Sequence, residues 1–289
     1  MPFTLAHPAA VLPLMRGPLV PTALVAGAVS PDLPYFLRAT GIPVTAQSWY
    51  EPLTNATTTH SLPGLLTVAV PLALLLHLGL RAALAPLATL GPAPAHAAAA
   101  GARSRGGRPG LGRGVAVVGW VALSLVLGVL THVVWDSFTH GDGWVVQQVP
   151  ALSDPVLGRL TWARALQHAS TVVGLSVLLV HLWRRRGRLL PRPGTAARAR
   201  LARVAVLAVV VAAAGAVVTT RGWWGADATT GVLVEGLLSD GAKGAGAAVA
   251  GVAAVGVAAW WVLHLPGVAR VRPARGASGG GPDVRSLDR

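Results

Sequence analysis

Apolar residues fill five long stretches of the chain, each suited to crossing the hydrocarbon core of a membrane. A transmembrane helix needs about 20 predominantly apolar residues, because the core is about 30 Å thick. The stretches lie at residues 62–84, 115–135, 169–183, 204–219 and 245–263. The third is short and extends outward through Leu166. The pattern therefore predicts an all-α fold, a polytopic transmembrane helical bundle with five full spans.

A further apolar segment near the N-terminus is interrupted. Residues 8–14 and 18–29 are apolar, and Arg16, Gly17 and Pro18 mark a turn between them. Each half is too short to span a bilayer, and no basic residue precedes the segment, as a signal peptide would require. We expect residues 8–30 to form a helical hairpin that is either re-entrant or interfacial.

Composition supports a membrane protein with one embedded domain. The 289 residues are 53% hydrophobic and 12% charged, with a mean hydropathy of +0.59, whereas soluble domains carry about 25% charged residues. Cysteine is absent, which excludes disulfides, thiolate metal sites and cysteine nucleophiles. We expect one domain over residues 1–266, with a core motif region at 1–183, a flexible linker at 86–114, C-terminal spans at 203–265 and a flexible basic tail at 267–289.

The net charge of +14 is divided unevenly between the two ends of the predicted spans. Eighteen of the 24 basic residues fall on one side, which carries a net charge of +16 and leaves −2 on the other. Cytoplasmic loops of membrane proteins are enriched in Arg and Lys, so we expect the basic side and the C-terminus to be cytoplasmic. The Arg runs lack interleaved aromatic residues, which favours contact with anionic lipid headgroups over nucleic acid. They occupy residues 86–114 together with Arg81, residues 184–203 and residues 267–289.

Histidine and aspartate residues gather at the opposite, outer ends of the predicted spans. Nitrogen and oxygen ligands of this kind suit zinc or manganese, and zinc is the first choice for a His-containing site. A divalent metal ion is therefore the expected cofactor. The gathered residues are Asp32, His60, His132, Asp136, His140 and His168.

The segment 131–140 carries the strongest local signal. His132 and Asp136 are four residues apart and share one helical face, so they can bind one ion. His140 lies about 12 Å along the helix axis from His132, too far for the same coordination shell. It is then a supporting group, a ligand to a second metal, or a residue redirected by the turn at 141–143.

Other candidates come from loops and helix ends. Asp32 follows the hairpin in a Ser-Pro-Asp turn, and His60 and Ser61 precede the first long span. Ser61 could contact a substrate or simply cap that helix. His168 begins the third span, with Gln167 beside it. His7 can join the group only if the hairpin returns to the outer face.

Several of these motifs, taken in order, resemble those of a bacterial family of multi-spanning membrane proteins of unknown function. They are MPFTLAHPAAVLPL at 1–14, SPD at 30–32, THS at 59–61, WDSFTH at 135–140 and QH at 167–168. The resemblance covers residues 1–183 and implies a bacterial inner (plasma) membrane. That family is similar to membrane-bound metal-dependent hydrolases and, more remotely, to zinc-dependent phospholipases C. The resemblance implies metal ligation by His7, Asp32, His60, His132 and Asp136.

Two functions follow from these observations. The first is a metal-dependent hydrolase that acts on a lipid or lipid-linked phosphoester at the outer interface. Asp32, Asp136 and His140 are its candidate catalytic residues; Ser61, His140 and His168 are candidate supporting or substrate-contacting residues. The alternative is a non-enzymatic transporter or assembly factor, in which the same group forms a structural metal clip or a proton relay.

Overall fold

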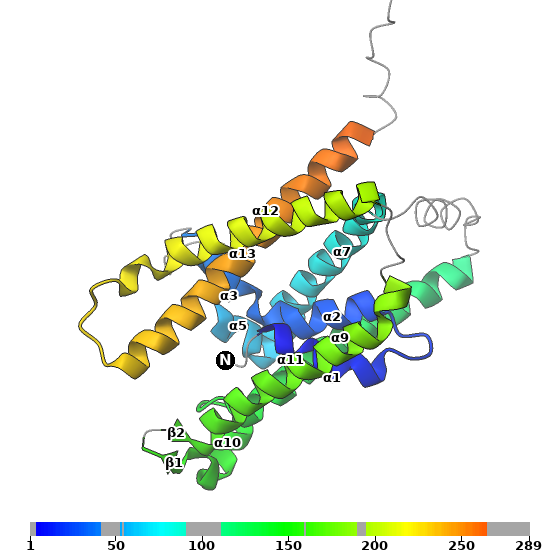
Figure 1. Cartoon of the computed structure of the whole chain (residues 1–289). Helices are drawn as coiled ribbons and strands as arrows, with labels where there is room; N and C mark the ends of the chain where they lie inside the picture. The colour runs from blue at the N-terminus through cyan, green and yellow to red at the C-terminus, as the bar shows by residue number, and fades with distance from the viewer. Residues whose placement is uncertain are drawn as a thin grey trace, which may run out of the picture.

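The computed structural model describes residues 4–41, 53, 55–90, 111–158, 160–189 and 195–264. Within these residues, five helices are long and apolar enough to cross a membrane, which confirms the predicted fold. The spans are Leu62–Thr89, Gly114–Thr139, Trp162–Arg185, Arg198–Trp223 and Thr230–His264. The long helices that form these spans, some of them extending a few residues beyond, are α7 (Val70–Leu90), α9 (Leu111–Thr139), α11 (Trp162–Leu189), α12 (Thr195–Thr220) and α13 (Thr230–His264) (Figure 1). Most of the predicted linker and all of the predicted tail lie outside the described residues.

Short elements connect these helices. The first span begins with α6 (Leu62–Gly64) and one turn of π-helix (Leu65–Ala69) before α7. The two strands pair in an antiparallel hairpin. The other short elements are η1 (Thr4–Ala6), α1 (Pro8–Val11), η2 (Leu12–Leu14), α2 (Pro21–Val29), η3 (Ser30–Asp32), α3 (Leu33–Arg38), α5 (Ala56–His60), α10 (Trp144–Gln148), η5 (Pro150–Ser153), β1 (Pro155–Leu157), β2 (Leu160–Thr161) and η6 (Arg221–Trp223).

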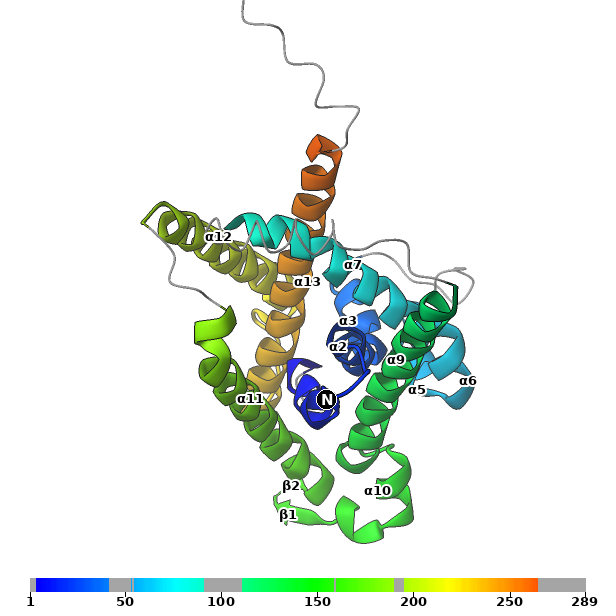
Figure 2. The ribbon, with the colours of Figure 1, turned by 90° about the vertical axis from the view of Figure 1, so that its right-hand side faces the viewer.

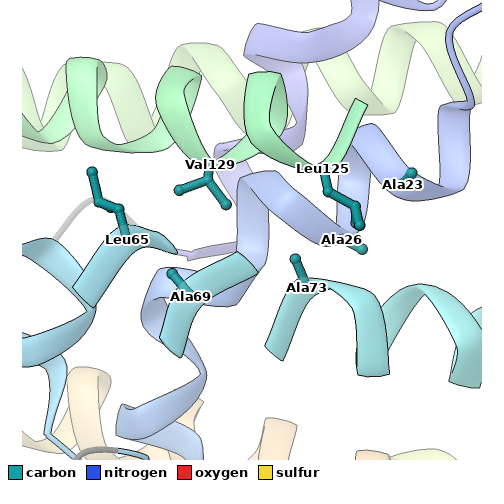
Figure 3. Close-up of a cluster of buried hydrophobic side chains, with 7 residues drawn as sticks. All are labelled: Ala23, Ala26, Leu65, Ala69, Ala73, Leu125 and Val129. Atoms are coloured by element: carbon teal, nitrogen blue, oxygen red, sulfur yellow. The ribbon is translucent and has the colours of Figure 1, made fainter. Parts of the chain in front are cut away.

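The N-terminal hairpin lies inside the bundle. Its turn contains Gly17 at φ +62°, a left-handed conformation that favours glycine. Helix α2 packs against both α7 and α9 (Figure 2). Small residues of α2, of the π-helical turn η4 (Leu65–Ala69) and of α7 meet larger residues of η4 and α9 in a buried cluster (Figure 3), formed by Ala23, Ala26, Leu65, Ala69, Ala73, Leu125 and Val129. The sequence left open where the hairpin lies, and the structure buries it among the spans.

Helices α12 and α13 form a second packed pair beside this core (Figure 1). They approach closely at Gly215 and Gly244, where an added Cβ would meet the backbone of the partner helix. Their outer faces expose large apolar side chains such as Val209 (68%) and Val255 (70%). Such faces are suited to contact with lipid.

One end of the bundle carries the predicted site and the other carries basic residues. At the end of the bundle that holds α10 and the strands lie the start of the first span, the C-terminal end of α9 and the start of α11 (Figure 1). The described basic residues near the opposite ends of the helices are Arg81, Arg184, Arg185, Arg198, Arg200 and Arg203.

Candidate metal centre

Four side chains from three segments converge at the end of α9. Asp32 ends η3, His60 ends α5, and His132 and Asp136 lie on the last turns of α9. One ligand atom from each of the four lies within 4.8 Å of the other three. His132 Nε2 is 3.2 Å from Asp136 Oδ2 and 3.5 Å from Asp32 Oδ1, and His60 Nε2 is 3.3 Å from Asp136 Oδ2. The structure thus brings together four of the five residues that the resemblance implies as ligands.

Hydrogen bonds to backbone carbonyls fix the orientation of both imidazoles. Nδ1 of His132 lies 2.8 Å from the carbonyl oxygen of Ala28, and Nδ1 of His60 lies 2.8 Å from that of Ala56. A carbonyl oxygen only accepts, so each Nδ1 carries the hydrogen and donates it. Each Nε2 therefore presents a lone pair to the group, which is the arrangement that metal-ligating histidines adopt.

The two carboxylates are oriented in the same way, from outside the group. The hydroxyl of Thr4 donates to Asp32 Oδ2 at 2.7 Å, and His7 Nε2 donates to Asp136 Oδ1 at 3.0 Å. The inner atoms Asp32 Oδ1, Asp136 Oδ2 and His132 Nε2 are buried and have no hydrogen-bond partner among the described residues. One ligand nitrogen of each histidine and one oxygen of each carboxylate therefore face one another.

This arrangement fits a divalent cation. Buried acceptors without partners cost free energy, and buried charges normally pair or coordinate metals. A tetrahedral zinc site with bonds of about 2.0–2.1 Å places its ligand atoms about 3.3 Å apart. The four His–Asp separations run from 3.2 Å to 4.0 Å, and all the ligand atoms lie within 4.8 Å of one another. Two nitrogens and two oxygens form a donor set that suits zinc, with manganese as the alternative.

His7 lies outside the four-atom group. Its ring stacks on that of His132, with centroids 3.9 Å apart and an interplanar angle of 18°. Both ring nitrogens face acceptors, since Nδ1 is 3.3 Å from the carbonyl oxygen of Thr4 and Nε2 binds Asp136. The N-terminal hairpin does return to the site, as ligation by His7 would require, but it places the imidazole behind the outer oxygen of Asp136.

His140 lies beside the group, at its rim. Its Nδ1 lies 3.3 Å from the backbone carbonyl oxygen of Asp136 and 3.5 Å from Asp136 Oδ2. The side chain is 23% exposed, against 5% for that of Asp136. Donation from Nδ1 to the carbonyl leaves Nε2 free, and burial lowers the pKa of His140, despite the carboxylate of Asp136. The imidazole is therefore a neutral group at the edge of the site.

Ser61 and His168 take other positions. Ser61 caps α6, because its hydroxyl accepts from the backbone nitrogen of Gly64 at 3.2 Å and donates to the carbonyl of Thr58 at 2.8 Å. His168 is exposed on α11 and lines a separate cavity. The hydroxyl of Thr59, in the same THS motif, donates to the backbone oxygen of Pro31 at 2.7 Å and so ties α5 to η3.

Electrostatics at the site keep Asp32 ionised and Tyr35 protonated. Burial raises the pKa of Asp32, but the nearby histidines, His132 above all, bring it below its ordinary value. Burial and the carboxylates of Asp32, Asp136 and Asp142 raise the pKa of Tyr35 to about 12. Tyr35 is therefore a hydroxyl donor beside the site, a residue that sequence reasoning did not single out.

One side of the group is open. A cavity of about 400 Å³ reaches it and is bordered by His60, Asp136 and His140. Tyr35 and Trp144 also line this cavity, and Trp144 is 71% exposed. The structure thus provides both a donor set and an access route.

The comparisons with known proteins agree with the uncharacterised family indicated by the motifs. A family model described as "Domain of unknown function (DUF4184)" matches residues 1–265. The chain belongs to this family. Within DUF4184 the match includes every residue of the His/Asp group and all five spans. No curated protein and no solved structure matches the chain.

Proposed function

We propose that the chain is a metal-dependent hydrolase that acts on a lipid or another phosphoester at the outer interface of a bacterial inner membrane. The observation that carries this proposal is the convergence of four ligand atoms, three of them buried without a hydrogen-bond partner. The distant resemblance to membrane-bound metal-dependent hydrolases supports the same reaction class.

Each residue of the site has a role in this proposal. Asp32, His60, His132 and Asp136 hold the ion. When bound, a divalent ion polarises a phosphoryl or ester oxygen and lowers the pKa of water toward neutrality. Both carboxylates are directed into the group, so His140 is the remaining proton acceptor within reach of the cavity.

Two groups outside the coordination shell position the carboxylates. Thr4 holds the outer oxygen of Asp32, and His7 holds the outer oxygen of Asp136. Partners of this kind orient a metal ligand and adjust its basicity. His7 is therefore proposed as a positioning residue.

The surroundings of the cavity favour a membrane-derived substrate. Exposed apolar side chains directly follow two of its lining residues in the sequence: Leu62 (83%) follows Ser61, and Phe138 (45%) follows Ser137. Basic residues lie near the opposite ends of the same helices, which by the positive-inside rule supports a cytoplasmic location for those ends and an extracytoplasmic one for the site.

The test is metal content and turnover in the full chain, purified in neutral detergent. We expect one zinc or manganese ion per chain by mass spectrometry of the metal. We also expect hydrolysis of a chromogenic phosphodiester, bis(4-nitrophenyl) phosphate, or of a fluorescent phospholipid. His132→Ala should lose both metal and activity.

The matched control is His77→Ala. His77 is also a buried histidine, 5% exposed and hydrogen-bonded to Thr22 at 3.1 Å, but it lies on α7 outside the group. This variant should keep its metal. A wild-type chain without stoichiometric metal would refute the proposal, and full metal occupancy with no turnover of either probe would favour a structural metal clip instead.

A further inference from the structure

A second and larger cavity lies beside the metal centre. It has a volume of about 790 Å³, within the usual range for ligand pockets, and is bounded by residues of α3, α11 and α13. We call it the α11–α13 cavity. Its lining mixes apolar residues such as Leu238 with hydrogen-bond donors, among them Tyr35, Arg164, Gln167, Thr171, Ser239 and Lys243.

Gln167 is the observation that points to a ligand. It lines the cavity, is only 2% exposed, and its amide nitrogen has no hydrogen-bond partner in the described part of the chain. A buried amide that lacks a partner costs free energy. This nitrogen is itself buried, so a small rotation of the amide toward the cavity would bring it to an acceptor on a bound molecule.

The charges around Gln167 indicate the kind of acceptor. Arg164 and Lys243 line the cavity with one acid, Glu235, which pairs with Arg164. Lys243 Nζ is 3.1 Å from Asp240 Oδ1, outside the lining. A guanidinium has five N–H donors and an ammonium three, so each cation retains donors beyond its ion pair. The lining therefore favours an anionic oxygen, as in a phosphate.

The cavity is also connected to the metal centre through shared residues. Thr4 lines it and donates to Asp32, one of the four grouped residues. Tyr35 lines both this cavity and the one that opens on His60 and Asp136. A molecule in the α11–α13 cavity would therefore lie next to the catalytic group, with Tyr35 between the two spaces.

The lipid-facing surroundings of the cavity suggest how its ligand is anchored. The cavity lies between two predicted membrane spans, α11 and α13. Flanking residues on both helices are apolar and exposed, including Val172 (66%) and Leu238 (70%). An acyl chain can lie along such a surface while a polar group enters the cavity.

We propose that the α11–α13 cavity binds the phosphate head group of an anionic membrane lipid. This assignment rests on the proposed function in one respect: the bound lipid belongs to the class of substrates that the neighbouring metal centre hydrolyses. Gln167 donates to a phosphate oxygen, Arg164 and Lys243 supply positive charge, and the acyl chains remain in the bilayer.

Native mass spectrometry of the full chain in neutral detergent tests the proposal. The probes are phosphatidylglycerol, diacylglycerol, which lacks the phosphate, and inorganic phosphate, which lacks the lipid. We expect phosphatidylglycerol to bind at least tenfold more tightly than either. Gln167→Leu removes a hydrogen bond to a charged group and should weaken phosphatidylglycerol binding about tenfold or more.

Gln148→Leu is the matched control, because Gln148 is exposed on α10 and lines none of the cavities described here. Metal content, measured on the same samples, should remain unchanged in Gln167→Leu. Should that variant not purify as a single species, Lys243→Gln removes a lining charge at similar side-chain length and is expected to weaken binding in the same direction.

The outcomes separate the two proposals. Unchanged phosphatidylglycerol binding in the folded Gln167 or Lys243 variant would overturn the head-group site, and equal affinity for inorganic phosphate would overturn its lipid specificity. A metal-free wild-type chain that still binds phosphatidylglycerol through Gln167 would refute the hydrolase and leave the head-group site standing.

Discussion

Gly128 is the position where a single methyl group should disturb the metal centre from a distance. Helices α9 and α2 cross there, with Gly27 facing Gly128 across the contact. A Cβ at residue 128 would lie 2.8 Å from the Cα of Gly27 and 2.9 Å from the backbone nitrogen of Ala28. Carbon atoms in contact normally lie about 3.5–4.0 Å apart, so Gly128→Ala must separate the two helices by about 0.7–1.2 Å.

The C-terminal end of α2 transmits that displacement to the site. Ala28 supplies the carbonyl oxygen that orients His132, and the chain continues directly from α2 to Asp32. Metal–ligand distances tolerate changes of only about 0.2 Å. We therefore expect Gly128→Ala to lower metal affinity at least tenfold, and to lower the free energy of unfolding by about 1–3 kcal/mol, as overpacked cores do.

The assay compares metal affinity, by competition with a chromogenic chelator, and thermal unfolding in detergent, for Gly128→Ala and Gly119→Ala. Gly119 lies on the same helix with nothing within 4 Å of an added Cβ. Its replacement should leave metal affinity unchanged and stability unchanged or slightly higher, since alanine favours helix more than glycine. If the two variants bound metal equally well, the proposed link between the helix crossing and the site would be refuted.

Two further predictions concern the site itself. His7→Ala keeps all four grouped ligands but frees the outer oxygen of Asp136, so metal affinity should fall about 10–100-fold with some binding retained; a complete loss, equal to that of His132→Ala, would instead assign His7 as a ligand. Adding zinc to chelator-treated protein should raise the unfolding temperature, because a ligand at 100 times its Kd stabilises the native state by about 2.7 kcal/mol. This gain should shrink as the pH falls, because protons compete with the metal for histidine ligands, and an equal gain at pH 5 would count against histidine ligation.

The spans and the local motif could be predicted because each depends on nearby residues. Five apolar stretches of sufficient length determined the spans, and a spacing of four placed His132 beside Asp136 on α9. The estimate that His140 lies too far along the helix for the same shell agrees with its position outside the group of four. Its side chain nevertheless folds back toward Asp136, which helix spacing alone did not determine.

Tertiary packing decided what the sequence left open. Whether the hairpin lay inside the bundle depended on the close fit of Gly27 against Gly128, which no periodicity shows. The resemblance implied His7 as a ligand because a resemblance compares residue types and their order. In the structure the His7 ring stacks on that of His132, and its Nε2 faces the outer oxygen of Asp136. Residue types alone do not determine this geometry.

The inward face of α11 was missed although a signal was present. His168 was the candidate from this helix, but spacings of three and four place another set of small and polar residues on one face. They are Ala163, Gln167, Thr171 and Gly174. Ala163 and Gln167 are 1% and 2% exposed, and an added Cβ at Gly174 would meet Ala6. A helical face of small and polar residues in an apolar span indicates contact with protein rather than lipid.

Metal binding and docking of the N-terminal hairpin are coupled by the same electrostatics. The hairpin region supplies Asp32, the carbonyl that orients His132, and His7, while α9 and α5 supply the remaining donors. Without a cation, docking the hairpin leaves buried ligand atoms without hydrogen-bond partners, which opposes the packing of α2 against α9. With a cation, the same contacts become favourable. The free energy of metal binding therefore contributes to holding the N-terminal segment inside the bundle, and loss of the ion should loosen this hairpin before the helices that span the membrane.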